Sequence, residues 1–91
     1  MKELQPTTKY RKDLKRYRHQ PQKLAALKRV LYILQNEQPI PPEYYPHMLH
    51  GDYEGCMECH IGSDFLLIWI NPDTELIELV RLGTHSELFG R

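Results

Sequence analysis

Four prolines close together divide this chain into two parts with different hydrophobic patterns. Pro39, Pro41, Pro42 and Pro46 lie within residues 35–53. Proline fixes φ and removes a backbone donor, which excludes a regular helix or a central strand in that segment. So long a loop is uncommon in a small domain and is often functional, so we expect it to contribute to a site.

The residues before the prolines predict a short strand and two helices. Residues 2–5 form the strand, and Thr7 or Thr8 can cap the helix that follows. Its apolar residues recur at the helical spacing i, i+4 and i+7, namely Tyr10, Leu14 and Tyr17. This helix should end near residues 19–20, and Pro21 suits the first turn of the second. Helices joined so closely should form an antiparallel pair.

The residues after the prolines predict a three-strand meander. The expected strands are residues 53–61, 64–70 and 75–82, with turns at 62–63 and 71–73. A short helical turn capped by Thr84 should close the chain. The whole chain, residues 1–91, is then one α+β domain with its helices on one face of a largely antiparallel sheet.

The meander brings polar residues from three strands to one end of the sheet. In an up-down-up arrangement, the end of the first strand, the start of the second and the end of the third lie together. Those positions hold His60, Asp64, Arg81 and His85. The proline-rich loop could bring His47 or His50 over the same end.

Such a cluster suits general acid–base chemistry. Imidazoles exchange protons near neutral pH, a carboxylate can orient them, and a guanidinium can stabilise phosphate charge. Metal-free phosphodiester cleavage is the natural interpretation. A single histidine at a strand end is more often merely solvated, however, and Arg81 could equally form a structural salt bridge to Glu78 or Asp64.

The zero net charge hides a strong asymmetry. Residues 1–35 carry ten Lys or Arg and two acidic residues, whereas residues 36–91 carry two Arg and ten acidic residues. A balance of +8 indicates an electrostatic partner for the helices, such as RNA phosphates. The candidate contact residues lie on the first helix: Lys9, Arg11, Lys12, Lys15, Arg16 and Arg18.

The segment Cys56-Met57-Glu58-Cys59-His60 matches the C-x-x-C-H pattern of haem attachment, and paired cysteines also occur in redox and zinc sites. In a strand, Cys56 and Cys59 would point to opposite faces about 10 Å apart, too far for a disulfide. We therefore expect two reduced cysteines and no metal or cofactor. One alternative is zinc held by His47, His50, Cys56 and Cys59.

Neither a membrane segment nor a secretory signal is expected. The longest apolar run, residues 65–70, is far too short to span a bilayer. Residues 1–10 contain no apolar signal core. A cytoplasmic protein without a membrane partner is the expectation.

The sequence resembles bacterial type II toxins of the RelE superfamily, in the YafQ branch, over nearly its whole length. The matching segments are residues 10–16, 39–45 and 47–51, then Gly55, His60 with Asp64, and residues 81–90, which are the most specific. The resemblance implies a RelE-like fold and a ribosome-dependent endoribonuclease that cuts mRNA by attack of the ribose 2′-hydroxyl.

The resemblance also implies partners and site residues. The partners are a cognate antitoxin and the ribosome with its 16S rRNA and mRNA, with DNA contacted only through the antitoxin. The functional positions fall on His47, His60, Asp64, His85 and Phe89, with Arg81 where a basic residue is usual. His85 is the expected main proton-transfer residue. The open alternatives are a non-catalytic RNA- or partner-binding module and the zinc-stabilised domain.

Overall fold

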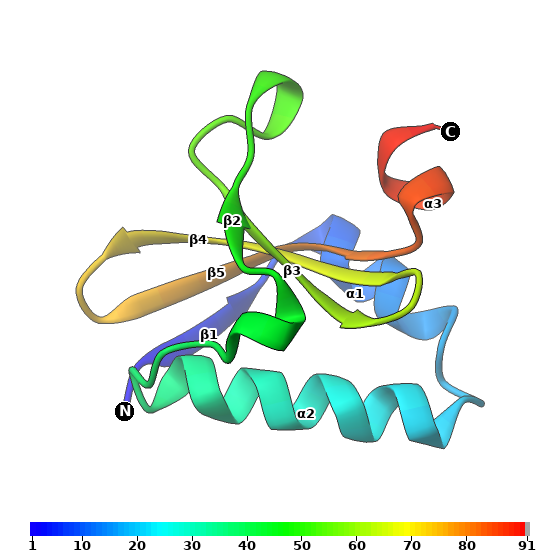
Figure 1. Ribbon diagram of the computed structural model, residues 1–91, viewed down its shortest axis with the longest axis horizontal. Coiled ribbons are helices and arrows are strands. Elements are labelled where there is room, and N and C mark those ends of the chain that lie inside the picture. The colour runs from blue at the N-terminus through cyan, green and yellow to red at the C-terminus, as the bar shows by residue number, and fades with distance from the viewer. Residues whose placement is uncertain (91) are drawn as a thin grey trace.

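The computed structural model describes residues 1–90, and its strands form one five-stranded sheet. The elements are β1 Glu3–Pro6, α1 Thr8–Lys15, α2 Pro21–Gln35, β2 His47–Met48, β3 Met57–Gly62, β4 Phe65–Asp73, β5 Leu76–Gly83 and α3 His85–Phe89. The sheet order is β1-β5-β4-β3-β2, with β1 parallel to β5 and the other neighbours antiparallel (Figure 1). The predicted α+β class and meander are confirmed.

The two long helices begin where the sequence predicts. The Thr7 hydroxyl caps α1 by accepting from the Tyr10 amide at 3.1 Å, and Pro21 opens α2. The predicted end of α1 near residues 19–20 is wrong, because the helix stops at Lys15 and a turn follows. Gln20 precedes Pro21 and is non-helical, because a steric clash with the proline ring disfavours the helical conformation of the preceding residue.

The strand boundaries differ from the predictions at three places. β3 begins at Met57 rather than at residue 53, because Gly51–Tyr53 forms a 3₁₀ turn. β4 continues through residues 71–73, so the predicted turn there is wrong and the chain reverses at residues 74–75. The proline-rich loop adds the two-residue strand β2 at the edge of the sheet. Prolines are tolerated near an edge strand because it needs backbone hydrogen bonds on one side only.

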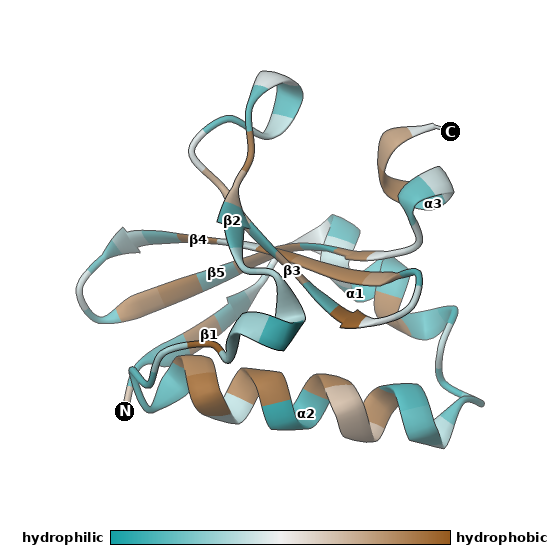
Figure 2. Ribbon diagram, viewed as in Figure 1, coloured by the Kyte–Doolittle hydropathy of each residue, from teal (hydrophilic) through white to brown (hydrophobic). Residues whose placement is uncertain are grey.

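Both faces of the sheet are covered. The larger core lies under α1 and α2 and is built on Tyr10, Leu27, Leu67 and Leu82. A second cluster, which includes Leu66, Ile68 and Leu88, lies on the opposite face beneath α3. Figure 2 shows the apolar residues gathered on the central strands and along α2. The prediction that the helix pair covers one face of the sheet is confirmed for α1 and α2, and the short C-terminal helix α3 covers the opposite face.

Candidate active site

Three histidines from separate segments form a row on the face of the sheet that α3 covers. His47 of β2 lies with its ring centroid 6.1 Å from that of His60 on β3, and His60 lies 5.6 Å from His85 of α3. His60 is paired across the sheet with Leu66, which belongs to the core under α3. The structure therefore brings together the histidines expected from the meander, and the loop contributes His47.

Asp64, in the turn between β3 and β4, holds His85 through two hydrogen bonds. Its Oδ1 accepts from the His85 amide at 2.9 Å and lies 2.7 Å from Nδ1 of the same residue. The backbone hydrogen bond, followed by that of the ring, lowers the pKa of Asp64 below its ordinary value. An ionised carboxylate only accepts, so Nδ1 carries the proton and Nε2 of His85 is left to exchange one.

The helix that carries His85 is fixed by its first turn. Thr84 and Glu87 form a capping box, with the Thr84 hydroxyl accepting from the Glu87 amide and Glu87 accepting from the Thr84 amide. Glu87 also accepts from the Tyr17 hydroxyl, which ties α3 to the turn after α1. Burial would raise the pKa of Glu87, but the hydrogen bonds from Tyr17 and Thr84 lower it overall.

Glu58 is a site residue that the sequence analysis did not identify. It is 3% exposed, with Oε1 3.1 Å from Nε2 of His47 and 3.9 Å from Nε2 of His60. Its Oε2 is buried without a hydrogen-bond partner among residues 1–90. The sequence signal that could have identified Glu58 is its i, i+2 spacing to His60, which puts both side chains on one face of a strand.

Arg81 pairs with a residue that the sequence analysis did not consider. Its Nε and Nη2 donate to Asp13 of α1 at 2.7 and 3.1 Å, and Nη1 donates to the Tyr53 hydroxyl at 3.0 Å. The hydrogen bonds to Asp13 outweigh burial and raise the pKa of Arg81. The salt bridges anticipated to Glu78 or Asp64 are not formed. The guanidinium thus joins α1 to β5 and to the loop.

Phe89 extends the site beyond the histidine row. Its ring centroid lies 6.4 Å from that of His85 and 5.8 Å from that of Tyr53, and the residue is 38% exposed. Phe89 and His85 line an open cleft of about 960 Å³. The other lining residues are Lys9, Leu49, His50, Asp52, Tyr53, Glu58 and Leu88. An exposed aromatic ring beside a histidine row offers a stacking surface for a planar group.

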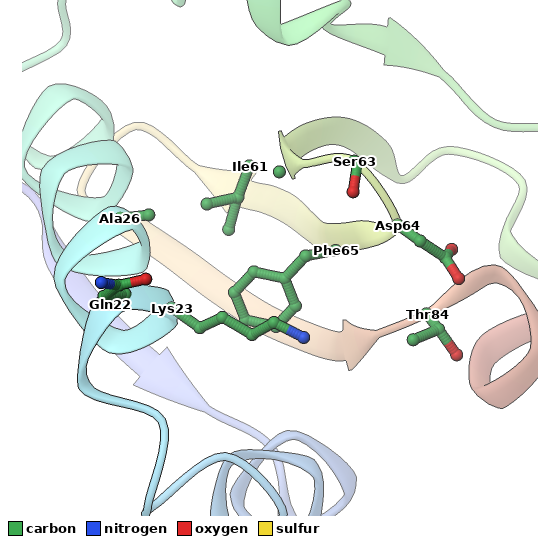
Figure 3. A pocket seen from close by; sticks show the side chains of 9 residues that line it. Gln22, Lys23, Ala26, Ile61, Ser63, Asp64, Phe65 and Thr84 are labelled. Atoms are coloured by element: carbon green, nitrogen blue, oxygen red, sulfur yellow. The ribbon is translucent and has the colours of Figure 1, made fainter.

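A smaller cavity of about 360 Å³ lies between α2 and the turn that holds Asp64 (Figure 3). Lys23 places its ammonium 5.2 Å from the ring centroid of Tyr17 and 5.5 Å from that of Phe65. The carboxylate of Asp64 turns away from this cavity toward Thr84 and α3 (Figure 3). Asp64 therefore contributes to the site through its hydrogen bonds to His85.

The two cysteines are reduced and buried on opposite faces of the sheet, as expected. Cys59 belongs to the core under α1 and α2, and Cys56 belongs to the core under α3. Burial, with a contribution from Glu58, raises the pKa of Cys59 to about 12. Within residues 1–90, no group of three or more His, Cys, Asp or Glu side chains is arranged to hold a metal ion. The four proposed zinc ligands therefore do not converge.

The six candidate RNA-contact residues of the N-terminal region are all exposed, but Arg16 and Arg18 lie in the turn after α1 rather than on the helix. Lys9 reaches the cleft, and Arg11, Lys15 and Arg18 line a groove between α1 and α2. Arg16 lies 2.9 Å from Asp13 and is partly neutralised by it. Of the helices in the described part of the chain, none is long and apolar enough to cross a bilayer.

Comparisons with known proteins agree with the sequence resemblance. The profile of a family described as "Bacterial toxin of type II toxin-antitoxin system, YafQ" matches residues 2–90. The chain is 31% identical over 90 residues to the mRNA interferase toxin YafQ of Escherichia coli (strain K12), covering 98% of this chain and 97% of that protein.

Solved structures show the same fold. The crystal structure of YafQ from E. coli strain BL21(DE3) matches with a TM-score of 0.88 at 27% identity, covering 99% of this chain and 100% of that one. The crystal structure of the E. coli DinJ-YafQ complex contains a chain that matches with a TM-score of 0.85 at 28% identity and the same coverage.

Proposed function

This chain belongs to the YafQ family of type II toxin–antitoxin toxins, and we propose that it is an mRNA interferase acting on ribosome-bound mRNA. The observation that supports the proposal most is the hydrogen-bonded pair of Asp64 and His85 at the end of the histidine row. We propose further that residues 1–91 act as one toxin domain.

The proposed reaction is intramolecular transesterification by the protein's own acid–base groups. One imidazole takes the proton from a ribose 2′-hydroxyl, whose oxygen forms a bond to the adjacent phosphorus. The bond from phosphorus to the 5′-oxygen breaks, and a second imidazole protonates that oxygen. The products are a 2′,3′-cyclic phosphate and a free 5′-hydroxyl.

His85 is the main proton-transfer residue in this proposal, because Asp64 fixes its Nδ1 and leaves Nε2 free. His47 is the second acid–base candidate, and His60 lies between the two rings. Phe89 stacks on a base next to the scissile bond. Because the Arg81 guanidinium is hydrogen-bonded to Asp13 and Tyr53, its contribution is to hold α1, β5 and the loop in place around the site.

The exposed basic residues of the N-terminal region are the proposed contact with 16S rRNA. Their phosphate contacts would make binding weaken steeply with salt. Lys9 is the member nearest the reaction, because it alone of the six lines the cleft with His85.

We also propose a cognate antitoxin as the partner of this chain, in the cytoplasm. The support is the E. coli DinJ-YafQ complex, whose matching chain covers 99% of this one. DNA would be contacted only through that antitoxin. Basic residues on the exposed face of α1 would favour an acidic segment of the antitoxin.

The test is cleavage of mRNA in a translating extract by the wild type, His85→Ala and His19→Ala. His19 lies in the exposed turn after α1, outside the cleft, and serves as the matched control. We expect cleavage by the wild type and by His19→Ala, and a loss of at least 100-fold for His85→Ala. Salt-sensitive RNA binding by the wild type without cleavage products would support the binding-module alternative instead.

A further inference from the structure

Glu58 is a buried carboxylate whose charged neighbours are imidazoles. Its side chain is 4% exposed, and it lies within ion-pair distance of His47 and His60. Oε2 has no hydrogen-bond partner among residues 1–90. A buried carboxylate without compensation is strongly destabilising, so this site requires a proton or a positive charge close to Oε1.

The contacts of His47 limit where that proton can lie. Its Nδ1 lies 2.7 Å from the carbonyl oxygen of Tyr45, which only accepts, so Nδ1 must donate. Its Nε2 lies 3.1 Å from Oε1 of Glu58, so a proton must lie between them, on either the carboxyl group or the ring. With Glu58 ionised, both ring nitrogens carry a proton and His47 is the imidazolium cation.

Tyr45 adds a second restraint on the same two histidines. Its backbone is in the left-handed region, with φ 50°, a conformation that a non-glycine residue keeps only where its surroundings enforce it. While its carbonyl holds His47, its ring meets that of His60 edge-on at 5.7 Å between centroids. Tyr45 therefore contacts both histidines, His47 through its carbonyl oxygen and His60 through its ring.

We propose that Glu58 is a positioning residue that orients His47 and holds it as an imidazolium beside His60, opposite the Asp64–His85 pair. The site then has two carboxylate–imidazole couples, one at each end of the histidine row. Glu58 acts through His47. This inference rests on the proposed RNA cleavage only for its kinetic consequence, because the charge state of His47 is a property of the free protein.

Other charged groups also face this part of the molecule. His60 is the nearest, on the same strand as Glu58. The remaining ones line the shared cleft from α1, α3 and the loop: Lys9, His85, His50 and Asp52. Of the acidic residues within 1–90, only Glu58 forms a salt bridge with His47. Replacing Glu58 should therefore shift the proton occupancy of His47 more than replacing any other acidic residue.

The decisive comparison is Glu58→Gln against Glu54→Gln. Glutamine keeps the size and an acceptor oxygen but removes the charge, and Glu54 is an exposed glutamate just before β3. Nitrogen-15 NMR of the imidazole rings at neutral pH should show both nitrogens of His47 protonated in the wild type and in Glu54→Gln. In Glu58→Gln, His47 should become a neutral tautomer. A neutral His47 in the wild type would overturn the proposal. This measurement uses the wild type alone, so it does not depend on whether the variants fold.

Kinetics provide the second measurement. We expect Glu58→Gln to lower kcat on the order of 10- to 100-fold with little change in KM. Glu58→Asp should restore part of the loss. An unchanged kcat together with unchanged ring spectra would refute the proposal. Absence of cleavage by the wild type would instead refute the proposed function, while the NMR result would still decide the role of Glu58.

Discussion

Asp13 and Arg81 are 68 positions apart in the sequence, yet their side chains form a two-pronged ion pair between α1 and β5. Asp13 is only 1% exposed and also accepts from the Leu82 amide at 3.0 Å and from Arg16 at 2.9 Å. Its two oxygens thus satisfy four donors. The pair fixes the end of β5 that leads directly into α3 and His85.

Removing this carboxylate should destabilise the protein strongly. Asp13→Ala removes the acceptor of Arg81 Nε and Nη2 and of the Leu82 amide, and breaking a buried pair from one side typically costs about 3–5 kcal/mol. Chemical denaturation should show a loss of this size. Glu3→Ala, at an exposed position of β1, is the control and should change the free energy of unfolding by less than about 0.5 kcal/mol. Equal stability of the two variants would contradict the structure.

Asp64 should remain ionised well into the acid range. Its pKa in the folded state is lower than in the unfolded chain, because of the backbone and then the ring hydrogen bond of His85. Its contribution to the α3 contact is therefore complete above the ordinary aspartate range, near 3.9, and is lost only as the pH falls through the lower folded value. The backbone amide signal of His85, followed by NMR during acid titration, should change below that ordinary range.

Asp64→Asn separates the fold from the chemistry of this pair. The amide oxygen of asparagine can still accept from the His85 backbone, so α3 should stay in place. The carboxylate that orients the His85 ring through Nδ1 is replaced by a neutral amide, so cleavage should fall by about 10- to 100-fold. Circular dichroism should match the wild type. Full activity in this variant would remove Asp64 from the proposed mechanism.

Gly83 should tolerate no side chain. Its φ of 156° is unfavourable for other residues, and a Cβ there would lie 2.6 Å from Oε1 of Glu87. Gly83→Ala should therefore displace the capping box, destabilise the protein by about 1–3 kcal/mol and reduce cleavage. Gly62→Ala is the matched control, since its nearest neighbour is a Phe65 carbon at 3.6 Å and its φ is not positive. Thermal unfolding of both variants gives the comparison.

Phe89 should act in RNA binding more than in folding. Truncation to alanine removes a partly exposed ring, and stacking of one base is worth about 1–3 kcal/mol. We expect Phe89→Ala to raise KM roughly 5- to 150-fold, with Phe89→Trp close to the wild type. A fall in kcat at unchanged KM would indicate instead that Phe89 orders α3.

Local sequence signals were sufficient for much of the fold. Thr7, Pro21 and Thr84 mark helix starts through capping and fixed φ, which depend only on nearby atoms. Boundaries that depend on distant partners were predicted less well. Residues 71–73 carry a turn signal, yet pairing with β5 keeps them in a strand.

The sequence alone also placed His60, Asp64 and His85 at one end of the sheet, because strand alternation and meander topology are local rules. Only the tertiary structure decided that Asp13, rather than Glu78 or Asp64, binds Arg81, and that Glu58 lies buried against His47. Those pairings join the loop, a helix and the sheet. Burial strengthens the interactions and determines which carboxylates become part of the site, and burial is a property of the packed molecule.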